Sequence, residues 1–410
     1  MSALSPFHEI LPSLEARLLA RGSLNLLLID ASSLEAVETE YGSAAFEEVR
    51  TRAITALVEA GGKDYRRNDL PVLDEPGGLR LLLFLDAKRR QSVPLGAADL
   101  RAARARLQKA VTPAIARATF PYLRVPPRVP IGQGVAVANP LVGTKRLVDR
   151  AYAGALEMAN VERRADELLT LERLQDLLVR EQVVTVYQPI VQMRDRMVVA
   201  YEALSRGARG SGLERADALF GAAERHGLLV ELDRLCRSRG LLSAGRLPSH
   251  SRVFVNTLPT TIRDPQFRGR PLIDFLERAN LAPRRIVVEI TEKLVIQNYG
   301  LFLETMAYFT DLGMSFAVDD VGAGYSGLEA IARLRPAYLK IDMGLVRDVH
   351  VSVVNREMVR AITALGHAIG AQVLAEGIES EDEAAVLLEL GVDLGQGFLF
   401  GRPAPGPEPG

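Results

Sequence analysis

The sequence has few of the residues that build disulfide or zinc frameworks. Its 410 residues include a single cysteine, Cys236, which excludes an internal disulfide framework and suits a reducing compartment. It has only five histidines, and none of them falls at the end of an apolar stretch. A histidine-based zinc site is therefore not expected. These shortages predict a cytoplasmic protein whose chemistry depends on other side chains.

Long apolar runs and a strong net charge are also missing. The longest runs, such as LRLLLFL at residues 79–85, are far too short to span a bilayer. The first residues, MSALSPFHEILPSLEARLLARG, include acids and no continuous apolar segment, unlike a secretory signal. The formal net charge is −1, so no global field favours nucleic acid or an anionic membrane. Neither a membrane span nor a nucleic-acid partner is expected.

The composition is that of an ordinary globular protein, with 48% hydrophobic and 25% charged residues. This length suggests two or three domains. The charged, helix-periodic stretch over residues 155–182 repeats leucines every three or four positions and predicts a connecting helix. We therefore predict a first domain at 1–160, a connecting helix at 161–182 and a second domain at 183–405.

The second domain reads as strands that alternate with helices. Eight apolar stretches predict the strands: VVTVYQPIV, MVVAYEAL, SRVFVNT, RRIVVEITE, SFAVDD, AYLKID, QVLAEGIE and LGQGFLF. Ser380 and Glu383 form a capping box, while Gly313 and Gly391 follow the ends of helical stretches. This pattern predicts an α/β fold of the TIM (β/α)8 barrel type. An open doubly wound sheet is the alternative, but it would usually offer a Gly-x-Gly-x-x-Gly turn, which is absent.

Acidic and amide side chains recur at the ends of these strands. The set comprises Gln188, Glu202, Asn256, Glu289, Glu292, Asp319, Asp320, Lys340, Glu376 and Gln396. Each residue taken singly would more often be a solvated strand end. Because the carboxyl ends of barrel strands open on one face, the set as a whole predicts a shared site.

The chemistry of such a site follows from its charge. Crowded carboxylates raise one another's pKa values unless cations neutralise them. Oxygen ligands without cysteine or histidine favour Mg²⁺ or Mn²⁺ over zinc, and the Asp319–Asp320 pair is suited to bridging two ions. Lys340 would then neutralise charge or hold the attacking water. A Schiff base on Lys340 is the weaker alternative, because that chemistry needs no crowd of carboxylates.

Eight ordered motifs over residues 171–404 resemble the EAL-domain cyclic di-GMP phosphodiesterases. They are YQPIV, YEALSRG, FVNTLP, EITE, DDVGAGYSGL, LKID, AEGIES and QGFLFGRP. The resemblance implies a modified TIM barrel with one antiparallel strand. It also implies Mg²⁺- or Mn²⁺-dependent hydrolysis of one phosphodiester bond of cyclic di-GMP, which gives linear pGpG. A homodimer that forms through the barrel is implied by the resemblance alone.

The resemblance also assigns roles by position. It implies metal ligands at Glu202, Asn256, Glu289, Asp319 and Asp320, with Asp319 shared between two ions. It implies that Lys340 contacts the nucleophilic water, that Glu376 is a base or a water-mediated ligand, and that Glu292 supports the glycine-rich loop. The nucleotide and its phosphate would be held by Gln188, Leu204, Arg206 and Gln396.

One loop departs from the family pattern. The family usually has DDFGTGYSSL, whereas this chain has Val321, Ala323 and Gly327 in place of phenylalanine, threonine and serine. A looser loop would give low or conditional activity. We therefore keep a receptor that binds cyclic di-GMP without cutting it as the alternative function. A metal-independent scaffold ranks last, because it leaves the acidic set without a purpose.

The first domain resembles the GGDEF diguanylate cyclase domains in three segments: LNLLLIDASSLEAVETEYGSAAFEEV, PIGQGVAVANP and RLVDRAYAGALEMA. Gly77 and Gly78 remain of the signature hairpin, but Leu79 and Arg80 stand where acidic residues would bind metal and substrate. A leucine and an arginine cannot replace metal-binding carboxylates. We predict a degenerate GGDEF-like domain used for regulation, dimerisation or binding of a protein partner.

Overall fold

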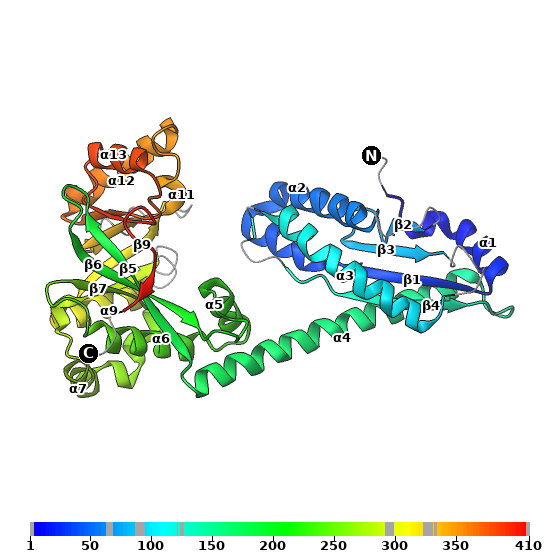
Figure 1. Cartoon of the computed structure of the whole chain (residues 1–410), viewed down its shortest axis with the longest axis horizontal. Coiled ribbons are helices and arrows are strands. Elements are labelled where there is room, and N and C mark those ends of the chain that lie inside the picture. Colours follow the sequence, from blue (N-terminus) through cyan, green and yellow to red (C-terminus); the bar gives the residue numbers. More distant parts are fainter. Residues whose placement is uncertain are drawn as a thin grey trace. The chain divides into compact units, whose positions relative to one another are not determined.

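The computed structural model describes residues 4–62, 69–86, 95–120, 122–123, 127–291, 299–322, 331 and 334–406. The chain forms two compact units, Met1–Thr170 (the first unit) and Leu171–Gly410 (the barrel unit) (Figure 1). The connecting helix expected at 161–182 is part of α4, which begins at Thr144 and ends at Val179. The three predicted segment boundaries stay predictions. None of the helices in the described ranges is long and apolar enough to cross a bilayer.

The first unit is an antiparallel sheet with helices on both faces. The strand order is β2-β3-β1-β4. Its strands are β1 (Ser23–Asp30), β2 (Leu70–Leu73), β3 (Arg80–Leu85) and β4 (Ile131–Val137). Its helices are η1 (Phe7–Ile10), α1 (Leu11–Arg21), η2 (Ser32–Leu34), α2 (Glu35–Gly62), α3 (Ala97–Thr119) and the first part of α4. This architecture is α/β, as expected.

Strand β1 explains why the sheet is covered on both sides. Alternate residues of a strand point to opposite faces. Leu27 and Ile29 pack in one hydrophobic core with residues of α2 and α3, and Leu26 and Leu28 pack in another with residues of α1 and α4. Residues 26–29 of the strand are therefore continuously apolar rather than alternating.

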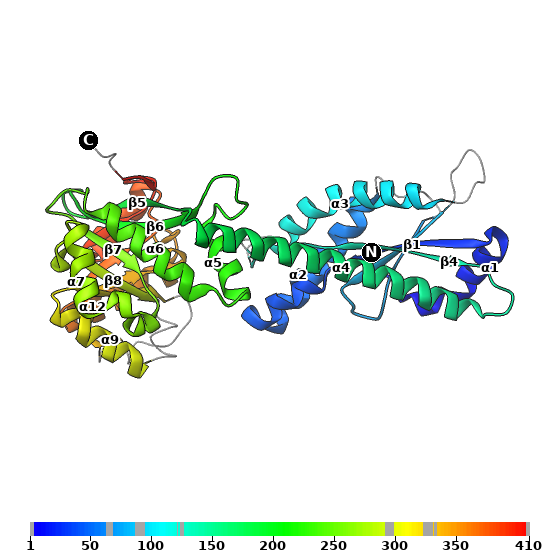
Figure 2. The ribbon, with the colours of Figure 1, turned by 90° about the horizontal axis from the view of Figure 1, so that it is seen from below.

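Helix α4 lies unusually close to β4 (Figure 2). A Cβ atom on Gly132 would lie 1.7 Å from the carbonyl oxygen of Ala155, and one on Gly134 would lie 2.1 Å from that of Ala151. No side chain fits between these backbones, so the two glycines of PIGQGVAV are needed for this packing.

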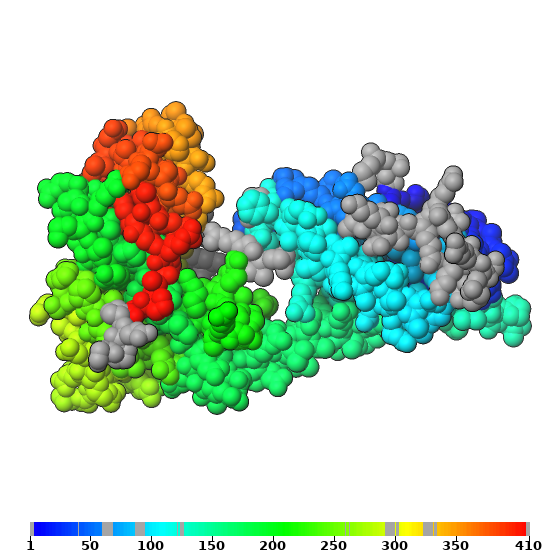
Figure 3. Space-filling view, viewed as in Figure 1, coloured from blue at the N-terminus to red at the C-terminus, as the bar shows by residue number. Residues whose placement is uncertain are grey.

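The barrel unit is a closed eight-stranded barrel with a ninth strand attached. Its strands are β5 (Val183–Gln192), β6 (Val198–Gly207), β7 (Arg252–Asn256), β8 (Ile286–Thr291), β9 (Ser315–Val321), β10 (Tyr338–Ile341), β11 (Gln372–Ala375), β12 (Leu394–Gln396) and β13 (Ala404–Pro405). Neighbours from β6 to β12 pair in parallel, whereas β5 is antiparallel to both β6 and β12 and closes the barrel between them. The expected modified TIM barrel is confirmed, and β5 is its antiparallel strand. Strand β13 pairs with Val186 and Tyr187 of β5 and is exposed at the surface (Figure 3).

Helices surround the barrel strands. They are α5 (Ala216–Arg225), α6 (Leu229–Ala244), η3 (Pro259–Arg263), η4 (Pro265–Phe267), α7 (Gly269–Arg278), η5 (Pro283–Arg285), α9 (Tyr299–Asp311), α11 (Met343–Val346), α12 (Val353–Ile369) and α13 (Glu381–Glu389). Helix α13 begins with the predicted capping box of Ser380 and Glu383. Gly313 and Gly391 follow α9 and α13 with positive φ angles, as a helix-ending glycine should.

Candidate functional site

The predicted polar residues form one layer of the barrel. A buried cluster of inward-facing residues comprises Ile190, Ala200, Phe254, Val287, Ala317, Tyr338, Leu374 and Leu394. Two positions further along each parallel strand lie Glu202, Asn256, Glu289, Asp319, Lys340, Glu376 and Gln396. Because side chains repeat their direction every second residue, these polar groups form the next layer toward the carboxyl ends of the strands. On antiparallel β5 the equivalent residue is Gln188, two positions before Ile190.

Lys340 lies at the centre of this layer and is fully buried. Its Nζ atom lies 2.6 Å from Glu289 Oε1 and 2.5 Å from Glu376 Oε1. It lies 3.1 Å from Asp319 Oδ2 and 3.6 Å from Glu202 Oε1. One ammonium group therefore faces four carboxylates.

Amide groups complete the layer. Asn256 Nδ2 donates to Glu202 Oε1 and to Glu289 Oε2, each at 3.2 Å. Gln396 Nε2 donates to Glu202 Oε2 at 2.6 Å and to Gln188 Oε1 at 3.1 Å. Both oxygens of Glu202 therefore accept a hydrogen bond from an amide.

Burial controls the protonation of these acids. Desolvation raises the pKa of Glu289 and of Glu376 well above the ordinary value, although Lys340 acts in the opposite direction on both. Desolvation also raises the pKa of Asp319, with a further contribution from the Glu202 carboxylate. Burial lowers the pKa of Lys340, but the surrounding carboxylates outweigh burial and raise it well above its ordinary value. The lysine stays charged, and its single charge is too small to balance the acids.

Asp320 belongs to the same region but has a different conformation. Its φ angle is +57°, in the left-handed region that non-glycine residues rarely adopt. Its backbone N–H donates to Asp319 Oδ1 at 2.9 Å. Desolvation, followed by the charges of Asp319 and Asp342, raises the pKa of Asp320 to about 6.

Two groups of carboxylates could each hold a cation. In each group one oxygen per residue lies within 4.8 Å of the others: Glu202, Glu289 and Asp319 form one group, and Asp319, Asp320 and Glu376 form the other. Asp319 belongs to both groups. The donors are all oxygens, which fits a hard divalent ion. The residues present fit the predicted cation site, with excess negative charge and a shared ligand.

Two predicted substrate residues lie on the same strand as Glu202. Glu202, Leu204 and Arg206 alternate along β6, so they share a face of the strand. Leu204 and Arg206 are half-buried. Arg206 Nη1 donates to the carbonyl oxygen of Ser205 at 2.8 Å, and burial lowers the pKa of its guanidinium. They follow Glu202 toward the end of the strand, and their predicted contacts with a nucleotide stay predictions.

Other predicted positions fall outside the described residues. They are Glu292, Ala323 and Gly327. Of the altered loop, Asp319 to Gly322 are described, and Val321 is fully buried. The roles predicted for Glu292 and for the rest of the loop therefore stay predictions.

One participant was not predicted from the sequence. The carbonyl oxygen of Gly401 accepts a hydrogen bond from Gln188 Nε2 at 3.1 Å. Every residue has a backbone carbonyl, so the amino-acid sequence does not show which of them accepts a hydrogen bond from a site residue. The only hint was the repetition of glycine in QGFLFGRP, with Gly401 four residues after Gly397.

The first unit also has acidic residues at strand ends, but arginines neutralise them. Asp30 ends β1 and is buried, as is Asp74 just after β2. Arg80 lies 3.5 Å from Asp30 and 3.3 Å from Asp74, and Arg163 lies 3.5 Å from Asp30. Leu79, the residue before Arg80, is buried in the core with α2 and α3. Two arginines therefore balance the two acids.

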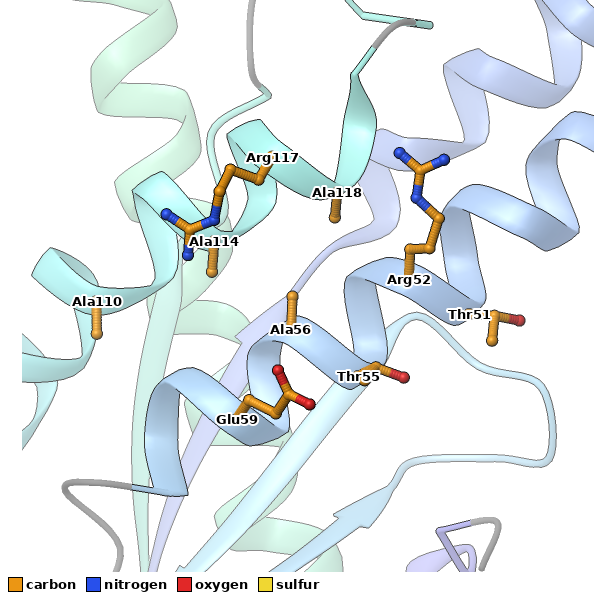
Figure 4. A pocket seen from close by; sticks show the side chains of 9 residues that line it. All are labelled: Thr51, Arg52, Thr55, Ala56, Glu59, Ala110, Ala114, Arg117 and Ala118. Atoms are coloured by element: carbon orange, nitrogen blue, oxygen red, sulfur yellow. The ribbon is translucent and has the colours of Figure 1, made fainter. Parts of the chain in front are cut away.

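A groove of about 640 Å³ lies between α2 and α3 of the first unit, remote in sequence from the carboxylate layer (Figure 4). Alanine side chains line much of it, with Arg52, Arg117 and Glu59 around them. Arg52 already pairs with Glu48. The groove gathers no set of reactive groups, so the candidate site is the layer around Lys340.

Comparison with known proteins gives relatives for the barrel unit. Cyclic di-GMP phosphodiesterase NbdA of Pseudomonas aeruginosa is 34% identical over 255 residues, which are 59% of this chain and 32% of that protein. Cyclic di-GMP phosphodiesterase PdeR of Escherichia coli is 36% identical over 250 residues, which are 60% of this chain and 38% of that protein. The chain therefore spans about a third of the length of these curated relatives.

Solved structures match the same part of the chain. The PaMucR phosphodiesterase in complex with c-di-GMP matches with a TM-score of 0.51 and 29% identity, over 58% of this chain and 97% of that one. The Xanthomonas citri FimX EAL domain matches with a TM-score of 0.54 over 59% of this chain and 97% of that one; at 23% identity it supports the fold alone. The EAL domain model matches residues 171–403, which is more than half of the chain, and the chain therefore belongs to the EAL domain family.

Proposed function

We propose that the barrel unit hydrolyses one phosphodiester bond of cyclic di-GMP to linear pGpG, with two Mg²⁺ or Mn²⁺ ions. The observation that carries this proposal is the pair of carboxylate groups that share Asp319 beside a buried lysine. The relatives NbdA and PdeR are named cyclic di-GMP phosphodiesterases, and the matched PaMucR structure is a c-di-GMP complex. The residue types and the relatives therefore support the same chemistry.

The ligands divide between two ions. Glu202, Asn256, Glu289 and Asp319 would hold the first. Asp319 and Asp320 would hold the second, with the Glu376 carboxylate beside them. When bound, such ions stabilise negative charge on the phosphate oxygens and lower the pKa of a bound water.

The remaining residues act on the water and the substrate. Glu376 accepts a proton from the attacking water, and the ammonium of Lys340 orients that water. The water oxygen bonds to phosphorus while the P–O3′ bond breaks, leaving a 5′-phosphate and a 3′-oxygen that takes a proton from solvent to become a hydroxyl. The guanidinium of Arg206 holds the phosphate, for which its planar fork is suited. Gln188, Leu204 and Gln396 line the nucleotide site, and Glu292 supports the glycine-rich loop.

For the first unit we propose a catalytically inactive GGDEF-like domain with a regulatory role. Arg80 occupies a position where a metal-binding acid is expected, and it pairs with both Asp30 and Asp74. A site filled by the chain's own cations has no carboxylate left for a metal. A homodimer, a protein partner of this unit and a cytoplasmic location stay predictions.

The test is to incubate the full chain with cyclic di-GMP and Mg²⁺ or Mn²⁺ and to separate the products by chromatography. We expect pGpG from the native chain, and none after Glu202→Ala or addition of EDTA. Tight binding of cyclic di-GMP by the native chain without cleavage would contradict the enzyme and support the receptor. Cleavage that survives EDTA would contradict the metal mechanism.

A further inference from the structure

We propose that Gln396 and Gln188 are positioning residues that hold the Glu202 carboxylate in the orientation needed to bind a divalent ion. They do so through a hydrogen-bond chain that ends on the backbone of Gly401. The inference rests on the metal site of the proposed function. It does not depend on which substrate that site cleaves.

The hydrogen-bond chain consists of three hydrogen bonds, two between buried side chains and one to a backbone carbonyl. Gln188 Nε2 donates to the carbonyl oxygen of Gly401 at 3.1 Å. Gln396 Nε2 donates to Gln188 Oε1 at 3.1 Å and to Glu202 Oε2 at 2.6 Å. Gln188, Gln396 and Glu202 are 8%, 4% and 6% exposed, so water cannot easily replace any of these bonds.

The Gly401 carbonyl determines which group donates and which accepts in every bond of the hydrogen-bond chain. A carbonyl oxygen can only accept, so Gln188 must present its NH₂ group to Gly401 and its oxygen to Gln396. Gln396 must then present its NH₂ group to that oxygen, and the same group reaches Glu202. A flipped amide at either glutamine would place two acceptors against each other. Glu202 is thereby required to accept at Oε2.

This hydrogen-bond chain leaves the Glu202 side chain little freedom to rotate. Oε2 accepts from Gln396, and Oε1 accepts from Asn256 at 3.2 Å. A flexible glutamate would otherwise lose conformational entropy when an ion bound. Partners that orient metal ligands typically contribute about tenfold to hundredfold in metal affinity. The amides therefore prepare Glu202 before the ion arrives.

The fold positions Gln188 and Gly401, which form the end of the hydrogen-bond chain remote from Glu202. Gln396 pairs with Ile190 across the β12–β5 junction, which places it beside Gln188, two residues earlier on the same face of β5. The Gly401 N–H donates to the carbonyl oxygen of Gly397 at 3.1 Å, and this turn returns Gly401 to β5. A Cβ atom on Gly401 would lie 2.7 Å from Cγ of Pro189. Alanine at this position would therefore push the carbonyl away from Gln188.

The test is calorimetric titration of the full chain with Mn²⁺, without nucleotide. Gln396→Met keeps the side-chain length and removes the donor, and we expect the Mn²⁺ affinity to fall at least about tenfold. Gln188→Met and Gly401→Ala should lower the affinity by less, because Asn256 and Gln396 still hold Glu202. Gln372→Met is the matched control, since Gln372 is exposed at the start of β11. Unchanged thermal unfolding would show that each variant is folded.

A double-variant cycle separates positioning from general damage. If Gly401 acts only through Gln188, Gly401→Ala combined with Gln188→Met should bind Mn²⁺ as weakly as Gln188→Met alone. If the losses of Mn²⁺ affinity in the two single variants add up in the double variant, the proposed hydrogen-bond chain is contradicted. Unchanged Mn²⁺ affinity in Gln396→Met, with weaker binding of cyclic di-GMP, would overturn the inference and leave a purely substrate-binding role.

The result also separates this inference from the proposed function. A native chain that binds Mn²⁺ but does not cleave cyclic di-GMP, with weaker Mn²⁺ binding in Gln396→Met, would sustain the inference and refute the hydrolase. A native chain that does not bind Mn²⁺ would refute both.

Discussion

Both units place carboxylates at the ends of buried strands, but they balance the charge differently. In the first unit, Asp30 and Asp74 face Arg80 and Arg163. Among the described residues of the barrel unit, one lysine faces four carboxylates, and a fifth, Asp320, follows Asp319. The first arrangement is neutral within the chain itself. The second is complete only when protons or external cations supply the missing positive charge.

The difference shows that acidic residues at strand ends do not by themselves predict a metal site. What matters is the ratio of acids to the chain's own cations and the depth of burial. Arg80 begins β3 and is the cross-strand neighbour of Asp30, so this one residue supplies a cation to both acids of the first unit. The barrel has no second buried cation among its described inward-facing residues.

The largest effect is expected for Asp319→Asn. Asp319 belongs to both carboxylate groups, so the change weakens both proposed ion sites. Loss of several kcal/mol of transition-state stabilisation corresponds to a fall in hydrolysis of about a thousandfold or more. Initial rates of pGpG formation from cyclic di-GMP measure this effect.

Asp30→Asn in the first unit is the matched control, because it removes a buried strand-end carboxylate from the neutral arrangement. Its rate should stay within about twofold of the native rate, because substitutions at sites that share no partners usually act independently. Equal losses of hydrolysis rate in Asp319→Asn and Asp30→Asn would contradict the conclusion that only the carboxylates of the barrel unit serve the reaction.

The next effect concerns the stability of the metal-free barrel. Lys340→Met removes the cation that pairs with Glu289 and Glu376 and leaves these buried carboxylates without it. Breaking a buried ion pair from one side costs about 3 kcal/mol or more. We expect urea unfolding, followed by circular dichroism at neutral pH, to show this decrease in the free energy of unfolding.

Saturating Mn²⁺ should restore part of that loss, because an external cation replaces the missing charge. Lys145→Met is the control, since Lys145 is exposed in the first unit. Unchanged stability of Lys340→Met without metal would mean that the acids do not depend on the lysine.

A comparable effect is expected from pH. The pKa of Asp320 is raised to about 6 in the folded chain. Between its unfolded pKa near 4 and this value, the native state binds more protons than the unfolded state, so stability falls as pH rises. For a shift of about two pKa units the loss amounts to about 3 kcal/mol. The raised pKa values of Glu289, Asp319 and Glu376 act in the same direction.

Urea unfolding of the metal-free chain across this pH range measures the slope. Saturating Mn²⁺ should flatten it, because the ligands then stay deprotonated in the native state. Asp320→Asn should reduce the slope without metal. A stability that rises with pH in the metal-free chain would contradict the raised pKa values.

The sequence predicts much of the barrel and of its site. Strands that are covered on both faces are continuously apolar, so all eight were visible as runs, and each site residue lies where its run ends. The layer of polar site residues could have been located more closely on each parallel strand. Each of its residues lies two positions after an inward-facing residue of the apolar layer. Ala200 before Glu202 and Ala317 before Asp319 illustrate that spacing.

Features that depend on register or on backbone could not be predicted. The reversed direction of β5 follows from its pairing with β6 and β12, which only the family resemblance anticipated. Strand β13 consists of an alanine and a proline, a composition that does not predict a strand. The positive φ of Asp320 and the contact of Gly401 with Gln188 depend on long-range packing. Local patterns carry no information about such contacts.

The smallest effect is expected for Arg80→Met, and it tests the neutral arrangement itself. Arg80 is partly exposed, and its ion pairs with Asp30 and Asp74 are 3.5 Å and 3.3 Å long, so we expect a loss of about 1 kcal/mol in stability. Hydrolysis in the barrel should not change. With one cation removed, the two acids of the first unit are no longer balanced, and Mn²⁺ should now slow hydrogen exchange in β1 and β3, whereas we expect no such effect in the native chain. Exchange in these strands that stays insensitive to Mn²⁺ would mean that burial and geometry, rather than charge balance, distinguish the two units.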